Sequence, residues 1–173
     1  MAGLLALSGS VVSAAPARAG ASTTVTALVA LHSQKLLDVR GASHAAGADL
    51  VQWSFNNGDN QRWSALPFSS IGGFDLVILQ SVESGLVLDV SGSSTANGAP
   101  IVQTPWAGKL SQLWITLPLA NESPFYVIVN VNSSRVLDVA GASLAEGAPV
   151  IQWNWHGGTN QIWSKIVFTV TNP

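Results

Sequence analysis

One short sequence phrase, whose side chains suit hydrogen bonding to hydroxyl groups, occurs three times in this 173-residue chain. Each copy opens with two apolar residues and Asp-Val, and closes on Gln-x-Trp. A carboxylate accepts hydrogen bonds from two adjacent hydroxyl groups, and an amide both donates and accepts them. The pattern therefore predicts binding chemistry at three equivalent places. The repeated aspartates and the residues of the Gln-x-Trp motifs are Asp38, Gln61 and Trp63; Asp89, Gln112 and Trp114; and Asp138, Gln161 and Trp163.

Groups suited to catalysis or metal binding do not come together in the sequence. The nine carboxylates form no close pair apart from those one repeat away, and the three histidines lie in different contexts. No His, Cys and Asp/Glu spacing suits a metal, and neither Gly-x-Ser-x-Gly nor a glycine-rich phosphate loop is present. We therefore expect no enzymatic activity, no metal and no cofactor.

The spacing of the repeats predicts the architecture. Asp38 and Asp89 are 51 residues apart, Asp89 and Asp138 are 49 apart, and the Gln positions repeat both intervals. A unit of about 50 residues cannot bury its apolar face alone and shares a core with its copies. Short β-branched runs, separated by Gly, Ser and Asn clusters, predict about four strands per repeat and about twelve in all. The alternation over residues 125–132 predicts a strand with one buried face.

Composition limits the possible partners. The chain has no Cys and only 9% charged residues, so burial must hold the fold together. About 150 residues suffice for a single domain with one core. The seven Lys and Arg residues are scattered and the net charge is −2, so we expect no nucleic-acid partner. No segment reaches the roughly 20 apolar residues that span a bilayer.

The first 22 residues predict an export signal. Residues 3–15 are apolar and small, and Ala17-Arg18-Ala19 has the small-x-small form of a cleavage site. Cleavage after Ala19 would produce a secreted, extracellular protein, and the lack of Cys favours a bacterial one. The alternative for residues 1–22 is a disordered N-terminal segment.

The repeats resemble the ricin-type β-trefoil lectin domain over residues 23–173. The likeness rests on three Gln-x-Trp motifs in register, each preceded by an apolar-Asp-Val strand and a Gly-Ala-x-apolar-apolar-Gln strand. This resemblance implies an all-β fold of three repeats with pseudo-threefold symmetry, in which a six-strand barrel is capped by three hairpins. Members of the family bind sugars, often of the galactose type or, in modules attached to xylan-degrading enzymes, plant-wall polysaccharide.

The resemblance also implies where sugars bind. A site in this family combines the Asp of the Asp-Val strand, an aromatic platform, a polar residue three positions later, and the Asn before Gln-x-Trp. The flat aromatic suits the apolar C–H face of a pyranose, and the carboxylate and amides suit its hydroxyls. Two repeats have the complete set, which is Asp38, Trp53, Asn56 and Asn60 in repeat 1, and Asp138, Trp153, His156 and Asn160 in repeat 3.

Repeat 2 is degenerate. It keeps Asp89 but has Thr104, Ala107 and Ser111 at the other three positions, so we expect it not to bind sugar. Asp89 persists without the other ligands. The alternative to sugar binding for Asp38 and Asp138 is therefore a purely structural role. The alternative for Trp53 and Trp153 is ordinary apolar packing at the surface, and the alternative for His156 is that it is an ordinary surface residue. We assign the Gln and Trp residues of all three Gln-x-Trp motifs to the structural core.

Three functions fit these features. The first is a secreted, non-catalytic carbohydrate-binding protein with working sites in repeats 1 and 3. The second is a targeting module that accompanies a glycoside hydrolase. The third is a trefoil-type protease inhibitor or interaction protein, which would not need Asp, Trp and Asn repeated in register. The sequence therefore favours the two carbohydrate-binding functions.

Overall fold

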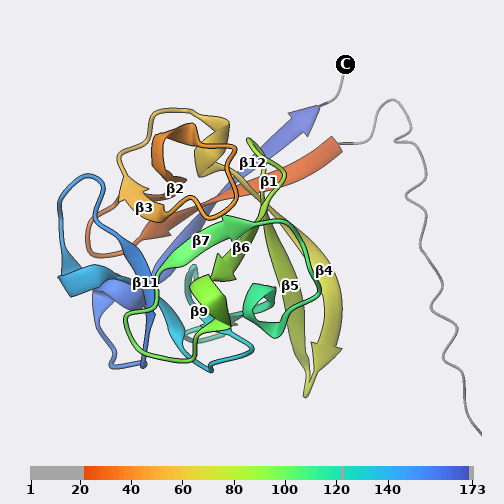
Figure 1. Cartoon of the computed structure of the whole chain (residues 1–173), viewed down its shortest axis with the longest axis vertical. Helices are drawn as coiled ribbons and strands as arrows, with labels where there is room; N and C mark the ends of the chain where they lie inside the picture. Colours follow the sequence, from red (N-terminus) through yellow and green to blue (C-terminus); the bar gives the residue numbers. More distant parts are fainter. Residues whose placement is uncertain (1–21, 122, 172–173) are drawn as a thin grey trace, which may run out of the picture.

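The computed structural model describes residues 22–121 and 123–171, and these form twelve β-strands joined by turns (Figure 1). The strands build a β-trefoil, as the resemblance to the ricin-type lectin domain implies. The prediction of an all-β fold with three repeats of four strands is thus confirmed. The expected export segment at residues 1–22 lies outside the described residues, apart from Ser22.

Six strands close into a barrel. Antiparallel pairing runs from β1 to β4, β5, β8, β9, β12 and back to β1, so the described barrel strands form a closed ring. Strands β1 and β12, which begin and end the described chain, pair over nine residues and lie side by side in Figure 1. The barrel strands are β1 (Ser22–Ala30), β4 (Trp63–Ile71), β5 (Phe74–Ser81), β8 (Trp114–Pro118), β9 (Phe125–Asn130) and β12 (Trp163–Thr171).

Three short hairpins cap the barrel, one in each repeat. In all three, the repeated Asp pairs with the second residue of the other strand, Asp38 with Val51 in the first. This common register gives the molecule its pseudo-threefold symmetry. The hairpins are β2 (Leu36–Val39) with β3 (Leu50–Trp53), β6 (Val87–Val90) with β7 (Ile101–Thr104), and β10 (Val136–Val139) with β11 (Val150–Trp153).

Six one-turn 3-10 segments complete the repeats, two in each. The first follows each Asp-Val strand and contains a left-handed glycine, such as Gly41 with φ +63°, which lets the chain reverse tightly. The second leads into each Gln-x-Trp motif. The segments are Arg40–Ala42, Asp59–Gln61, Ser91–Ser93, Leu110–Gln112, Ala140–Ala142 and Thr159–Gln161.

The core lies where the barrel meets the hairpins. The tryptophans Trp63, Trp114 and Trp163 have 0% exposure and belong to one apolar cluster to which all three repeats contribute. Each indole N–H donates to the carbonyl of the residue before the repeated Asp, at 3.1–3.2 Å. A buried indole pays a free-energy penalty if its N–H lacks an acceptor, so these bonds let the ring pack without that cost.

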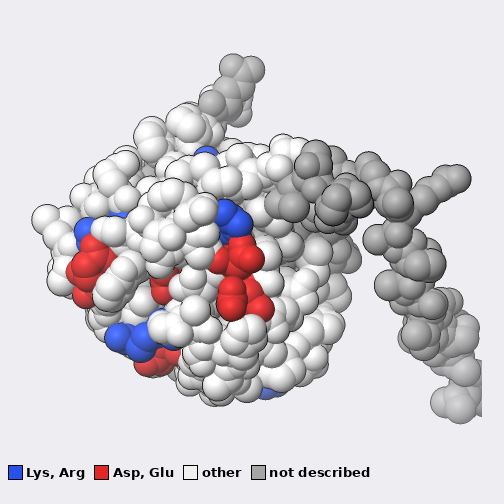
Figure 2. Space-filling view, turned by 90° about the horizontal axis from the view of Figure 1, so that it is seen from above, with Lys and Arg blue, Asp and Glu red and all other residues white. Residues whose placement is uncertain are grey.

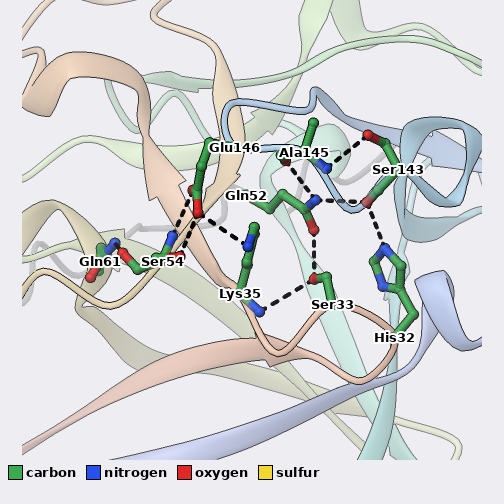
Figure 3. A network of polar contacts seen from close by, with 9 residues as sticks. All are labelled: His32, Ser33, Lys35, Gln52, Ser54, Gln61, Ser143, Ala145 and Glu146. Carbon is green, nitrogen blue, oxygen red and sulfur yellow. Dashed lines mark hydrogen bonds and ion pairs between the residues drawn. The ribbon is translucent and has the colours of Figure 1, made fainter.

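Three buried glutamines join the repeats to one another. Gln52 at the end of β3 donates to the carbonyls of Ser143 and Ala145 in repeat 3, at 2.7 and 2.9 Å, and accepts from Ser33 (Figure 3). Gln103 binds repeat 1 and Gln152 binds repeat 2 in the same way. Each repeat therefore holds a loop of the preceding one, with repeat 1 holding repeat 3, and the three contacts close a circle.

Burial along β9 does not follow the alternation of residues that the sequence predicts. Ile128 and Asn130 are fully buried, whereas Val129 is half-buried. Asn130 is accommodated because its amide donates to the carbonyl of Ser111 at 2.9 Å and its oxygen accepts from the backbone N–H of Asn132 at 3.1 Å. A polar side chain with this many partners is buried at little cost.

Candidate functional site

The hairpins of repeats 1 and 3 each place an aspartate beside an exposed tryptophan. Asp38 and Asp138 are only 3% exposed, whereas Trp53 and Trp153, at the ends of the opposite strands, are 42% and 41% exposed. Hydrophobic side chains of this size are usually buried, so an open indole face beside a carboxylate indicates a binding surface.

Site 1 is a shallow pocket of about 310 Å³ in repeat 1. The structure brings all four residues predicted for this repeat into it: Asp38, Trp53, Asn56 and Asn60. The sequence reasoning missed other lining residues, which come from the turn after β2 and from β3. These additional residues are Arg40, Gly41, Ala42 and Val51.

Site 3 is the equivalent pocket in repeat 3, with a volume of about 320 Å³. It likewise gathers the four predicted residues, Asp138, Trp153, His156 and Asn160. Gly141, Ala142 and Ile151 complete its lining. A shared Gly-Ala-Ser sequence after the Asp-Val strand of repeats 1 and 3, replaced by Gly-Ser-Ser in repeat 2, is the signal by which the turn residues could have been found.

In repeats 1 and 3, the glutamine of the Gln-x-Trp motif orients the aspartate of the site. The Gln61 side-chain nitrogen donates to Asp38 Oδ2 and to the Ser54 carbonyl, both at 2.9 Å, while its oxygen accepts from Asn56 N–H at 3.0 Å. Gln161 makes the same three kinds of contact in site 3, with a 2.7 Å bond to Asp138 Oδ2. Carboxylate oxygens have two lone pairs each, so both aspartates keep capacity to accept from a ligand.

Asn56 and His156 occupy the same place although their side chains differ. Asn56 Oδ1 accepts from the Gly58 N–H at 2.8 Å, and His156 Nδ1 accepts from the Gly158 N–H at 3.2 Å. The neutral imidazole then carries its proton on Nε2, which lies 3.6 Å from Asp138 Oδ2. Both side chains are therefore held in place by the backbone N–H of the glycine two residues later, and each keeps an N–H group that is not used in this contact.

Two glycines missed by the sequence reasoning make this arrangement possible. A Cβ on Gly58 would lie 2.3 Å from Asn60 Oδ1 and 2.9 Å from Asn56 Oδ1, and Gly158 has equally close neighbours in Asn160 and His156. Repeat 2 has Lys109 at this position. The glycine thus distinguishes the two complete repeats from the degenerate one.

In repeat 2 the aspartate, Asp89, accepts a hydrogen bond from a side chain of its own hairpin. Thr104, which stands where the other repeats have tryptophan, donates its hydroxyl to Asp89 Oδ2 at 2.8 Å. Gln112 donates to the Thr104 hydroxyl at 2.8 Å instead of reaching the carboxylate. The other oxygen, Asp89 Oδ1, is buried and has no hydrogen-bond partner among the described residues. Repeat 2 therefore offers neither an aromatic platform nor an accessible carboxylate.

Comparison with known families identifies the family of this chain. The sequence profile of the family described as ricin-type beta-trefoil lectin domain-like matches residues 18–104, 68–153 and 110–172. The chain belongs to this family. A comparison with curated protein sequences gives no match.

Solved structures similar to this ricin-type lectin domain include a designed protein and parts of natural ones. The designed threefold-symmetric protein ThreeFoil is 37% identical, with a TM-score of 0.77, and the match covers 82% of this chain and 97% of that one. An exo-β-1,3-galactanase from Clostridium thermocellum is 31% identical over 84% of this chain, with a TM-score of 0.77, but over only 30% of its own length. The Rhizoctonia solani agglutinin is 25% identical, with a TM-score of 0.69 and coverage of 88% and 99%.

Burial perturbs both aspartates of this lectin domain. It raises the pKa of Asp38 from 3.8 to about 6, although hydrogen bonds from Gln61 and Asn60 oppose the shift and the charge of Glu146 adds to it. Burial also raises the pKa of Asp138, against hydrogen bonds from Gln161 and the nearby His156. The carboxylate of site 1 therefore gains a proton as the pH falls through about 6.

One wall of each site comes from the preceding repeat, which is repeat 3 for site 1 and repeat 2 for site 3. The six-membered ring of Trp53 lies 3.4 Å from the position of a Cβ on Gly147, and that of Trp153 lies 3.5 Å from the equivalent point on Gly98. In site 1, Glu146 fixes this wall because it accepts from Ser54, the residue after Trp53, and pairs with Lys35 at 3.1 Å (Figure 3). A loop of repeat 3 thus supports the platform of site 1.

Other kinds of site do not emerge from the part of the chain that the structure describes. Within residues 22–121 and 123–171, His, Asp and Glu form no group of three that could hold a metal ion. In the same residues, no helix is long and apolar enough to cross a membrane.

Proposed function

We propose that this chain is a carbohydrate-binding protein with two working sugar sites, site 1 and site 3, and a repeat 2 that does not bind sugar. The observation that carries the proposal is the pairing of an exposed tryptophan with an oriented aspartate and two further polar side chains. This set lines a pocket in two repeats and is absent from the third, where Thr104 binds the aspartate. Sugar hydroxyls need such donors and acceptors, and the C–H face of a pyranose needs a flat apolar surface.

Each site alone should bind weakly. A shallow pocket buries little area, and water competes at every hydroxyl, so we expect a monosaccharide dissociation constant of about 0.1–1 mM. Two sites on one rigid domain can engage one branched polymer together, and the second contact then occurs at high effective concentration. Avidity for polysaccharide should exceed single-site affinity by about 100-fold.

Titration calorimetry with the monosaccharide selected on a glycan array tests this proposal. We expect two sugars per parent chain and one per chain after Asp38→Ala or Asp138→Ala, because each loses charge-assisted hydrogen bonds worth about 1.5–3 kcal/mol. Asp89→Ala is the matched control and should still bind two. A loss of one sugar in Asp89→Ala would show that the assignment of sites to repeats is wrong.

A second candidate is a module that directs a glycoside hydrolase to its polymer. The observation in its favour is the 31% identity to part of an exo-β-1,3-galactanase. Under this proposal the protein is retained on immobilised β-1,3-galactan and on no unrelated polymer such as cellulose. In both candidates we propose that the protein is exported, which N-terminal sequencing of the secreted form tests by finding Gly20 first.

A further inference from the structure

The residues that line sites 1 and 3 differ in formal charge at one position. The residue after the Asp-Val strand is Arg40 in repeat 1 and Ala140 in repeat 3. Their backbones are alike, because both residues begin a one-turn segment whose next residue is a left-handed glycine with φ of 62–63°. The two pockets therefore share a frame, and one of them carries an added guanidinium group.

The Arg40 guanidinium stands at the edge of the tryptophan platform. Its Nη1 lies 3.8 Å from the Cβ position of Gly147, and the Trp53 ring lies 3.4 Å from the same point. Nη2 donates to the Gly147 carbonyl in a long bond of 3.4 Å. Since Arg40 also lines the pocket, a sugar stacked on Trp53 would have this cation beside it.

Most hydrogen-bonding capacity of Arg40 remains open. Its side chain is half-exposed, and the nearest carboxylate, Asp49, is also half-exposed with a distance of 3.9 Å between Arg40 Nε and Asp49 Oδ2. A guanidinium has five N–H donors in a planar fork that matches a carboxylate. The contacts with Asp49 and Gly147 are long, so they leave this fork available to a ligand.

Two carboxylates near site 1, those of Glu146 and Asp38, would only partly oppose the binding of a negatively charged ligand. Glu146 is paired with Lys35 at 3.1 Å. Asp38 lies on the pocket floor, where Gln61 donates to its carboxylate and holds it toward the hydroxyls of a ligand. Figure 2 shows the surface charges in small mixed groups of both signs on one face, so any selectivity for anions must come from local contacts.

We propose that site 1 prefers sugars that carry a carboxylate, namely hexuronic acids, and that Arg40 is the residue that creates this preference. Site 3, with Ala140, has no such preference. The inference rests on the proposed function, because the stacked sugar brings its carboxylate to Arg40. A solvent-exposed ion pair contributes little, so the expected preference over the neutral sugar is about fivefold at low salt and smaller at high salt.

The test compares galactose with galacturonic acid by calorimetry in two single-site proteins, each chosen so that one pocket is silent. Trp153→Ala leaves site 1, and Trp53→Ala leaves site 3. We expect the dissociation constant for galactose to be about five times that for galacturonic acid in the Trp153→Ala protein. In the Trp53→Ala protein the two constants should be about equal. Arg40→Gln added to Trp153→Ala should bring the ratio of these two constants to one, and Ala140→Arg added to Trp53→Ala should raise it.

The possible outcomes separate this inference from the function beneath it. If neither single-site protein binds either sugar and the parent binds none on an array, the proposed function fails. If Trp153→Ala binds galactose but favours galacturonic acid no more than Trp53→Ala does, the role of Arg40 is wrong and the sugar sites remain. Tight binding of galactose 6-sulfate without binding of galacturonic acid would overturn the assignment to carboxylates.

Discussion

Substitution of Gly58 by alanine should abolish sugar binding at site 1 while leaving the fold intact. The glycine has φ −74°, which any residue adopts, so the added methyl introduces no backbone strain. It would stand 2.3 Å from Asn60 Oδ1 and 2.9 Å from Asn56 Oδ1, both closer than real contacts allow. To reach ordinary contact with the methyl, the Asn60 amide must move away by about 1 Å and the Asn56 amide by about 0.5 Å.

The size of the effect follows from the bonds that the amides make. Displacement of Asn60 loses its 3.2 Å bond to the Val39 carbonyl, which is worth about 1 kcal/mol of stability and about 2–4 °C in melting temperature for a domain of this size. Loss of both amides as sugar ligands should cost about 1–3 kcal/mol, which is about 5- to 150-fold in affinity.

Calorimetry with Gly58→Ala in the Trp153→Ala protein measures this loss directly. Lys109→Ala alters the same position of repeat 2 and should change nothing, while Gly158→Ala in the Trp53→Ala protein should silence site 3. Undiminished sugar binding by Gly58→Ala, with a melting temperature equal to that of its parent, would refute the placement of Asn56 and Asn60 as ligands.

Three further predictions concern the core, the pH and the joints between repeats. Trp114→Ala should lower the free energy of unfolding in urea by about 3–5 kcal/mol, whereas Trp106→Ala, at an exposed position, should lower it by less than about 1 kcal/mol. Sugar affinity at site 1 should weaken as the pH falls through about 6 and Asp38 gains its proton. The folded chain takes up that proton more readily than the unfolded chain does, because the pKa of Asp38 is higher in the folded state. The free energy of unfolding should therefore fall as the pH rises from about 4 to about 6, and Asp38→Asn should remove this dependence on pH. Gln103→Ala removes the donor that the partly buried carbonyls of Ser43 and Ala45 share. It should destabilise the fold by about 1–3 kcal/mol in the same urea assay, with two sugars still bound per chain.

The fold was predictable because its determinants recur at a fixed spacing. Trp63, Trp114 and Trp163 fill one core, and a pattern that repeats near 50 residues indicates that shared core without any knowledge of contacts. The ligand set of each repeat was also within reach, because Asp38 and Trp53 lie on paired strands of a single hairpin. Local patterns carry this kind of information well.

Features that depend on close approach or on another repeat were not predictable. Gly58 has an ordinary backbone conformation, so the sequence gives no sign that a methyl group would collide there. Arg40 meets Gly147 across 107 residues of sequence. Burial of Asn130 depends on the carbonyl of Ser111, which lies 19 residues away in the sequence. Each of these requires the three-dimensional neighbours of a residue.

Repeat 2 shows why the aspartate alone is a weak sign of a sugar site. Asp89 is as buried as Asp38, yet it binds Thr104 and so serves the structure of its own hairpin. The repeat still supports site 3, because Gly98 lies beside the Trp153 ring and Asn97 accepts from the N–H of Asn154. In a trefoil whose repeats support one another in this way, one repeat can lose its own ligand set and leave the neighbouring site intact, provided that it keeps the loop that supports that site.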